Sequence, residues 1–346
     1  MLQACMFNQG LHSNWQKNVD QRQSASAYGY SIPAVHQDNI MIAGQDARLH
    51  IYSPNGWERQ RIALDAPCEG GILALKNGQA ILSDSQGTLY AVDTKQESVL
   101  WRYKLSSASL GHPVAFGHDI IVQTADNHIY RLNAKGKKQW SYAGSVGGLG
   151  MYFGSSPVVQ GQTIYAILNN GDAVALNASN GDLIWQKQLN IDPFAQVLSE
   201  LRAPVADPII AGNMLIVSFY QGELRALNLQ TGDIIWKRHF SLKSNPLLHQ
   251  GMLYFSTSTG DSLAINPKDG VTQWKQHLSS AEVVGPALYD QKLWFADHNG
   301  QIYALSTEGK VQQTMRIPAR IDRAPVSSAH GILIRNHRGV LHLVSQ

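Results

Sequence analysis

The amino-acid sequence predicts an all-β protein, an eight-bladed β-propeller whose blades are four-stranded antiparallel sheets. Three observations predict this fold: a phrase of alternating apolar residues that returns about every 40 residues, a Trp and a Pro that keep step with it, and a composition suited to one large core. One apolar position of the repeat marks its eight copies: Tyr52, Val92, Leu132, Leu176, Leu227, Ile265, Leu305 and Val344. This period, with two turns in each copy, fits one four-stranded blade per copy.

Two residue types recur at fixed places in the repeat. A Trp begins the strand after the second turn in most copies, at Trp57, Trp101, Trp140, Trp185, Trp236 and Trp274, and Gln313 takes this place in the seventh copy. A Pro precedes the first apolar run of every copy but the second, at Pro33, Pro113, Pro157, Pro208, Pro246, Pro286 and Pro325. Because Pro is tolerated at the first residue of a strand, where its missing N–H breaks no ladder bond, we predict that these runs are the innermost strands.

The eighth copy shows no fourth strand after Val344. A segment with the pattern of that strand, residues 13–19 around Trp15, lies near the N-terminus instead. We expect this segment to complete the last blade and close the ring without a gap. The predicted organisation is therefore a tether over residues 1–12 and a single propeller domain over residues 13–346.

Composition and charge narrow the class of protein. The chain is 44% hydrophobic and 15% charged, which suits one well-packed domain. No stretch approaches the roughly 20 apolar residues of a membrane-spanning helix. The net charge of +3 is too small to indicate a nucleic-acid partner. We expect a monomer that binds no nucleic acid and meets a membrane only through a lipid anchor.

The two cysteines, Cys5 and Cys68, are too few for a disulfide framework. Residues 2–5, Leu-Gln-Ala-Cys, resemble the lipobox at which bacterial lipoproteins are cleaved and acylated on Cys. A signal peptide needs an apolar stretch of about 7 to 15 residues before that site, and only Met1 precedes Leu2 here. Two interpretations stay open: a truncated signal with lipidation at Cys5, or a cytoplasmic protein that starts at Met1.

Residues typical of catalysis do not group along the sequence. The 13 histidines show no spacing typical of a metal site. The glycine-rich run 144–150 has no Lys-Ser/Thr ending, and no Gly-x-Ser-x-Gly elbow occurs. The sequence therefore predicts no catalytic residue, no metal and no cofactor. The alternative is that residues from distant blades come together around the central axis and form a metal site there.

Two spacings exceed the period, since Leu132 to Leu176 is 44 residues and Leu176 to Leu227 is 51. They predict two long connections, over residues 143–156 and 190–207, which leave neighbouring blades on the same face. Apolar and aromatic side chains beside an Arg are typical of a protein interface. The predicted partner-binding residues are Leu149, Met151, Tyr152, Phe153, Leu198, Leu201 and Arg202. The alternative is that these side chains fold back into the central channel or over a blade edge.

The segment 224–236, Leu-Arg-Ala-Leu-Asn-Leu-Gln-Thr-Gly-Asp-Ile-Ile-Trp, resembles the repeat of the propellers of the pyrroloquinoline-quinone (PQQ) type. Among these the chain is most similar, over residues 150–240, to the family of the outer-membrane assembly lipoprotein BamB. The resemblance implies a non-enzymatic periplasmic scaffold that binds a BamA-like barrel-assembly subunit and unfolded outer-membrane proteins.

The family's contact loop corresponds to residues 149–152. Leu149 and Met151 keep its apolar character, but Tyr152 stands where an Arg is expected, and residues 203–205 lack the family's acidic pair. The alternative function is a quinoprotein-like enzyme or small-ligand binder that uses the channel. Those enzymes carry an adjacent Cys-Cys pair that this sequence lacks.

Overall fold

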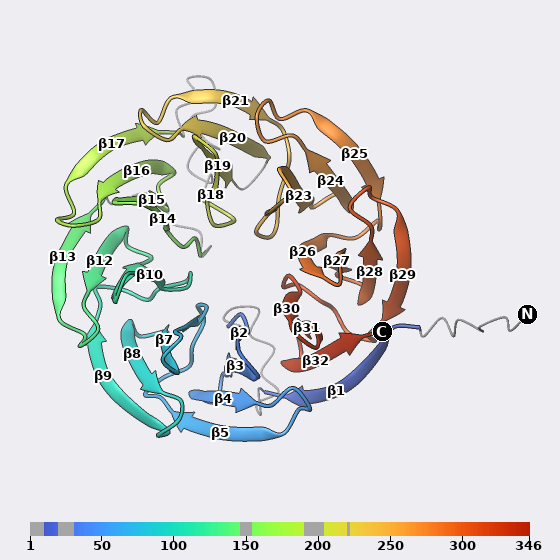
Figure 1. Ribbon diagram of the computed structural model, residues 1–346, viewed down its shortest axis with the longest axis horizontal. Coiled ribbons are helices and arrows are strands. Elements are labelled where there is room, and N and C mark those ends of the chain that lie inside the picture. Colours follow the sequence, from blue (N-terminus) through green and yellow to red (C-terminus); the bar gives the residue numbers. More distant parts are fainter. Residues whose placement is uncertain (1–9, 20–30, 146–153, 190–203, 220–221) are drawn as a thin grey trace, which may run out of the picture.

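The protein is a closed ring of eight sheets, seen here in a computed structural model that describes residues 10–19, 31–145, 154–189, 204–219 and 222–346. Each sheet contains four antiparallel strands that follow one another from the axis to the rim (Figure 1). The predicted all-β propeller is confirmed. Within the described residues no helix is long and apolar enough to cross a bilayer.

The first four blades have these bounds. Blade 1 consists of β2 (Ala34–His36), β3 (Asn39–Ala43), β4 (Arg48–Tyr52) and β5 (Glu58–Ala63), and blade 2 of β6 (Leu73–Ala74), β7 (Gln79–Ser83), β8 (Thr88–Asp93) and β9 (Ser98–Lys104). Blade 3 consists of β10 (Val114–Phe116), β11 (Asp119–Gln123), β12 (His128–Leu132) and β13 (Lys138–Ala143), and blade 4 of β14 (Val158–Gln160), β15 (Thr163–Ile167), β16 (Asp172–Asn177) and β17 (Leu183–Gln188).

The other four blades continue around the ring. Blade 5 consists of β18 (Ile209–Ala211), β19 (Met214–Phe219), β20 (Glu223–Asn228) and β21 (Ile234–Arg238), and blade 6 of β22 (Leu247–His249), β23 (Met252–Ser256), β24 (Asp261–Ile265) and β25 (Thr272–His277). Blade 7 consists of β26 (Val283–Tyr289), β27 (Lys292–Asp297), β28 (Gln301–Leu305) and β29 (Val311–Arg316), and blade 8 of β30 (Val326–Ser328), β31 (Gly331–Arg335), β32 (Val340–Ser345) and β1 (His12–Asn18).

The two middle strands of each blade are buried on both faces. In β16, for example, residues 172–176 are all buried. The buried apolar side chains form eight clusters, and each lies between two neighbouring blades. This arrangement explains the near-continuous apolar runs in the sequence, since a strand covered on both sides has no solvent face to keep polar.

The last blade joins the two ends of the chain. Strand β1 pairs antiparallel with β32, from His12 opposite Ser345 to Asn18 opposite Val340. The Val19 N–H continues this pairing by donating to the Gly339 carbonyl at 2.9 Å. The expectation that an N-terminal strand completes blade 8 is confirmed, and every blade has two neighbours to pack against.

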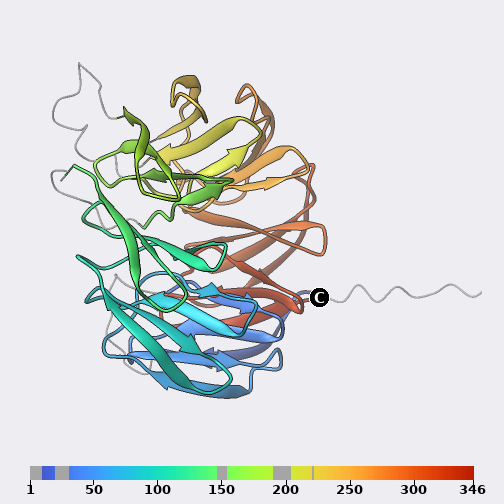
Figure 2. The same cartoon turned by 60° about the vertical axis from the view of Figure 1, so that its left-hand side comes forward.

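The up-and-down order of the strands gives the ring two distinct faces (Figure 2). One face, called the connection face below, carries the links between blades and the turns between second and third strands. The other, called the hairpin face, carries the turns between first and second strands and between third and fourth strands. The two long connections, from β13 to β14 and from β17 to β18, therefore belong to the connection face.

A Trp in the outer strand fastens each of six blades to the next. The indole packs against a turn glycine of the next blade so closely that an added Cβ would lie within about 3 Å of the ring, and its Nε1 donates to a backbone carbonyl of that blade. At blade 4, for example, Trp185 covers Gly232 and donates to the Leu229 carbonyl at 2.9 Å. The six Trp residues are Trp15, Trp101, Trp140, Trp185, Trp236 and Trp274, with donor distances of 2.7 to 3.0 Å.

Two blades depart from this pattern. In blade 7 the position belongs to Gln313, as predicted, and its amide oxygen accepts a hydrogen bond from Gln346 at 2.5 Å. In blade 1 the expectation that Trp57 holds the position is wrong. Trp57 lies in the turn before β5, is 75% exposed, and the strand register places Gln60 opposite Ile51 where the other blades place Trp.

Candidate docking surface on the connection face

The described ends of the two long connections are bonded to each other. Ser156, at the end of the first connection, donates its backbone N–H to Asp207 Oδ1 at 2.5 Å. Asp207 is the corresponding residue at the end of the second. The two connections thus reach their inner strands side by side, as the sequence predicts for neighbouring blades.

This contact belongs to a longer chain of side chains around the axis, which we call the pre-proline network. It contains His112, Ser156, Asp207 and Asn245, and each precedes the Pro before an inner strand. Ser156 Oγ lies 2.7 Å from His112 Nδ1 and accepts the His112 N–H at 2.8 Å. Asn245 Nδ2 donates to Asp207 Oδ2 at 2.7 Å, and the Asp207 N–H donates to Asn245 Oδ1 at 2.9 Å. Four successive blades are therefore linked beside the long connections.

The outer ends of the connections are also held. Asn127 Nδ2, in a turn of blade 3, donates to the Ser145 carbonyl at 2.9 Å. Arg225 Nη1, on β20, donates to the Leu189 carbonyl at 2.5 Å. Arg225 is buried and paired with Glu223, and its guanidinium lies 5.4 Å from the centre of the Phe219 ring. Both connections therefore leave and rejoin the ring at fixed points.

The predicted partner-binding residues lie between these fixed points and outside the described residues. This applies to Leu149, Met151, Tyr152, Phe153, Leu198, Leu201 and Arg202, and also to the candidate lipidation residue Cys5. The structure brings together the ends of the loops that carry the seven partner-binding residues. The assignment of a role to each of them, and the alternative that they fill the channel, stay predictions.

Ser156, His112 and Asp207 contain the residue types of a hydrolase triad, but their geometry does not fit one. Ser156 Oγ and Asp207 Oδ2 both face the same nitrogen, His112 Nδ1, at 2.7 and 3.6 Å. In a triad the imidazole uses one nitrogen for each partner, so that it can accept the serine proton while the carboxylate orients it. Ser156 is also 1% exposed and its Oγ already accepts a backbone N–H. The network is a structural tie between blades.

A second group of charged residues lies on the connection face at blades 6 and 7. Glu282 lies 3.1 Å from Lys243 Nζ and 3.3 Å from His298 Nδ1. Burial, with the nearby Arg320 charge second, lowers the pKa of His298, so this imidazole is neutral at pH 7. Among the described residues no group of three or more His, Cys, Asp or Glu side chains could hold a metal ion.

Sequence reasoning missed the pre-proline network, although its signal was present. The residues before Pro113, Pro157, Pro208 and Pro246 are all polar and hydrogen-bonding. A residue that precedes Pro is biased toward extended backbone conformations, so this position has a similar backbone geometry in each blade. Polar residues at this position in four neighbouring blades therefore indicate hydrogen bonds from blade to blade around the axis.

Comparison with known proteins agrees with the repeat and the closed ring. The family model described as "Outer membrane protein assembly factor BamB" matches residues 14–276 and 216–343. The chain belongs to this family. BamB relatives include one from Moranella endobia, 25% identical over 181 residues, which are 52% of this chain and 46% of the relative. The BamB of Bordetella pertussis is 24% identical over 328 residues, 93% of this chain and 84% of that protein.

The alignments with the first BamB relatives span about half the length of those proteins. The crystal structure of BamB from Moraxella catarrhalis superposes with a TM-score of 0.83 at 18% identity, covering 97% of this chain and all of that one. Solved quinoprotein dehydrogenases share the propeller at 11% identity, which is a likeness of fold alone.

Proposed function

We propose that this chain is a non-enzymatic docking scaffold that assists the assembly and insertion of outer-membrane β-barrel proteins. Membership of the BamB family supports the proposal, because its members carry the name of an assembly factor. The observation on which it rests is the bond between Ser156 and Asp207, since it joins the ends of two long connections on one face. In this function the ring is a rigid support and the connections are its contact surface.

The contact would use the apolar and aromatic side chains of the first connection and Leu198, Leu201 and Arg202 of the second. Interfaces favour such residues at their centre, because burying them removes apolar surface from water while Arg supplies several hydrogen-bond donors. The partner would be a BamA-like barrel-assembly subunit, and unfolded outer-membrane proteins would be its clients.

The test is a pull-down with the purified barrel-assembly subunit from the same organism. Leu149→Asp combined with Met151→Asp places two charges in the proposed surface and should abolish capture. The matched control is Leu183→Asp with Ile184→Asp, an exposed apolar pair on β17 (47% and 51% exposed), which should leave capture unchanged. A folded loop variant that captures the subunit as well as wild type would refute the proposed surface.

The proposed location is the periplasm, with a lipid anchor at Cys5 on the outer membrane. The basis is the lipobox-like sequence at residues 2–5 together with the family. The intact mass of the protein purified from its own membranes decides this point. Acyl chains on Cys5 add lipid mass to a chain that begins at that residue, whereas the unmodified mass from Met1 would contradict export.

A further inference from the structure

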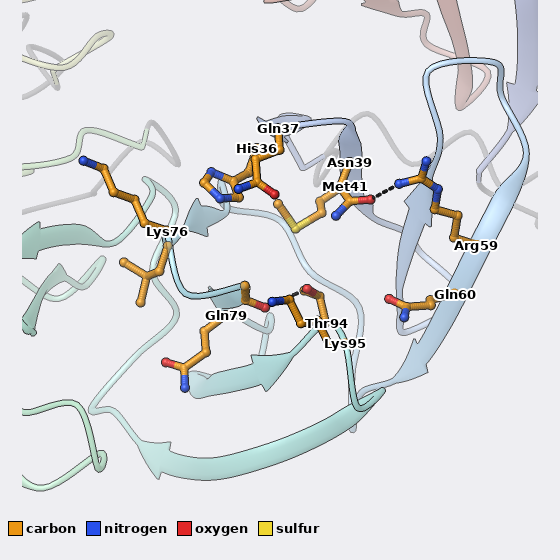
Figure 3. Close-up of a pocket in the computed structure, with 12 residues that line it drawn as sticks. His36, Gln37, Asn39, Met41, Arg59, Gln60, Lys76, Gln79, Thr94 and Lys95 are labelled. Carbon is orange, nitrogen blue, oxygen red and sulfur yellow. Dashed lines mark hydrogen bonds between the residues drawn. The ribbon is translucent and has the colours of Figure 1, made fainter.

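A cavity of about 220 Å³ lies between blades 1 and 2 (Figure 3). Its walls are the turn between β2 and β3, the start of β5, the turn between β6 and β7, and the turn after β8. All these segments belong to the hairpin face. The cavity is therefore on the opposite side of the ring from the proposed docking surface, and the inference drawn from it does not depend on that proposal.

The cavity occurs at one of the two junctions that lack the Trp contact. Gln60, which takes the Trp position in blade 1, lines it, and so does Thr94. Thr94 is the counterpart of Leu229 in blade 5, because each directly follows the last residue of its third strand. The Leu229 carbonyl accepts the hydrogen bond of the Trp185 indole. The receiving glycine is replaced as well, because Glu97 occupies that turn position with a φ of 54°. The space thus adjoins the place that an indole fills at six other junctions.

The chemistry of the lining favours an anion with an apolar body. Arg59, Lys76 and Lys95 contribute three cationic groups, and none of the described residues that line the cavity is acidic. Met41 and Leu75 provide an apolar surface. Cations close to a low-dielectric wall attract an anion more strongly than cations in open water, because the field is less screened there.

The cations are spread over the cavity. Figure 3 shows Arg59 at one end, where its Nη1 donates to Asn39 Oδ1 at 2.7 Å, and Lys76 at the other. Lys95 lies over Gly78, where an added Cβ would be 3.2 Å from its Cε. The bond to Asn39 gives the Arg59 guanidinium a defined position, and a guanidinium can bind a carboxylate through two parallel N–H donors.

Size sets the second limit on the ligand. An apolar cavity of about 150 Å³ holds a benzene molecule, so about 220 Å³ suits a body of one or two rings. We propose that this cavity binds a small aromatic carboxylate, with its rings against Met41 and Leu75 and its carboxylate at Arg59 and Lys95. Binding would place an aromatic group next to a junction that lacks the outer-strand Trp contact of six others.

The first experiment titrates indole-3-acetate into the full-length protein, with binding followed by ligand-observed NMR. Its roughly 13 non-hydrogen atoms, at the ligand efficiency of ordinary compounds, correspond to a Kd of about 1 mM. Indole alone and acetate alone each lack one half of the recognition and should bind at least about tenfold more weakly. Absence of saturable binding, or equal binding of acetate, would overturn the proposal.

Two variants locate the site. Gln60→Trp with Glu97→Gly supplies the missing indole and its glycine, so it should fill the space and remove indole-3-acetate binding. Arg59→Gln should weaken binding at least about tenfold, whereas Arg316→Gln, an exposed outer-strand arginine of blade 7, should not. Arg59 is exposed, so its variant keeps the packing and tests the site even if the double variant does not fold. Unchanged binding in Arg59→Gln would show that the ligand sits elsewhere.

Discussion

Replacing Trp185 by Ala tests whether the Trp contacts between blades stabilise the ring. The side chain is 9% exposed, it donates to the Leu229 carbonyl at 2.9 Å, and it covers Gly232. The substitution leaves a cavity between blades 4 and 5 and a buried carbonyl without its donor. Substitutions of buried Trp by Ala cost about 3 to 5 kcal/mol of unfolding free energy, and we expect a loss in this range.

The matched control is Trp57→Ala, which removes the same side chain from a turn where it is 75% exposed. A substitution of this kind changes stability by no more than about 0.5 kcal/mol. Urea denaturation followed by far-UV circular dichroism gives both free energies. For 346 residues the expected entropy of unfolding is about 0.7 kcal/mol/K, so Trp185→Ala should also lower Tm by about 4 to 7 °C. Equal losses for the two variants, or a loss below about 1 kcal/mol for Trp185→Ala, would refute the role assigned to these contacts.

Three further predictions concern polar contacts. Burial lowers the pKa of His342 below its ordinary value. The stability that comes from its neutral form is therefore complete above about pH 6.5 and declines as the pH falls toward the folded-state pKa. His342→Gln should reduce the drop in urea midpoint between pH 7.5 and 5.5, and an unchanged drop would contradict this prediction. Arg225→Ala leaves the half-buried Glu223 without this cationic partner and should cost about 3 to 5 kcal/mol in the same denaturation assay. A cost under about 1 kcal/mol, the size expected of a surface ion pair, would show that the pair is not needed. Asp207→Ala removes the acceptor of the Ser156 N–H and should cost about 1 to 3 kcal/mol of unfolding free energy. Amide hydrogen exchange should become faster at Ser156 than elsewhere in the ring, which distinguishes the loss of this hydrogen bond from a general loss of stability.

The repeat in the sequence predicts most of the fold. Two-sided burial makes the middle strands apolar throughout, and the turns between them recur at a fixed spacing, so blade number and strand order follow from the sequence. The closing strand was also predictable, because Trp15 in residues 13–19 repeats the outer-strand pattern that blade 8 otherwise lacks. Such features repeat locally and need no knowledge of distant contacts.

The wrong assignment of Trp57 has a local reason. In blades 3 to 6 the Trp stands four residues after the turn glycine, as Trp236 follows Gly232. Trp57 follows Gly56 directly, and the same count from Gly56 gives Gln60, the residue that the structure places there. Spacing from the glycine is thus a better guide than the presence of Trp, because the turn fixes the register of the strand that follows it.

The candidate site was less predictable than the fold. Spacing alone gave the two long connections and their common face, since strand order determines where each link emerges. The bonds among His112, Ser156 and Asp207 depend on how neighbouring blades pack, and residues more than 40 positions apart show no such contact in the sequence.

The pairing of β1 with β32 affects how the protein can be made. Residues 12–18 pair with residues 340–345, which follow them by more than 320 positions in the sequence. Until the last blade is available, residues 12–18 have no sheet to join, and the first and seventh blades each expose an uncovered face. Ring closure therefore needs both ends of the domain, and we expect that a chaperone that shields the unpaired segment and those faces before closure raises the yield of folded protein more than one that acts on any single blade.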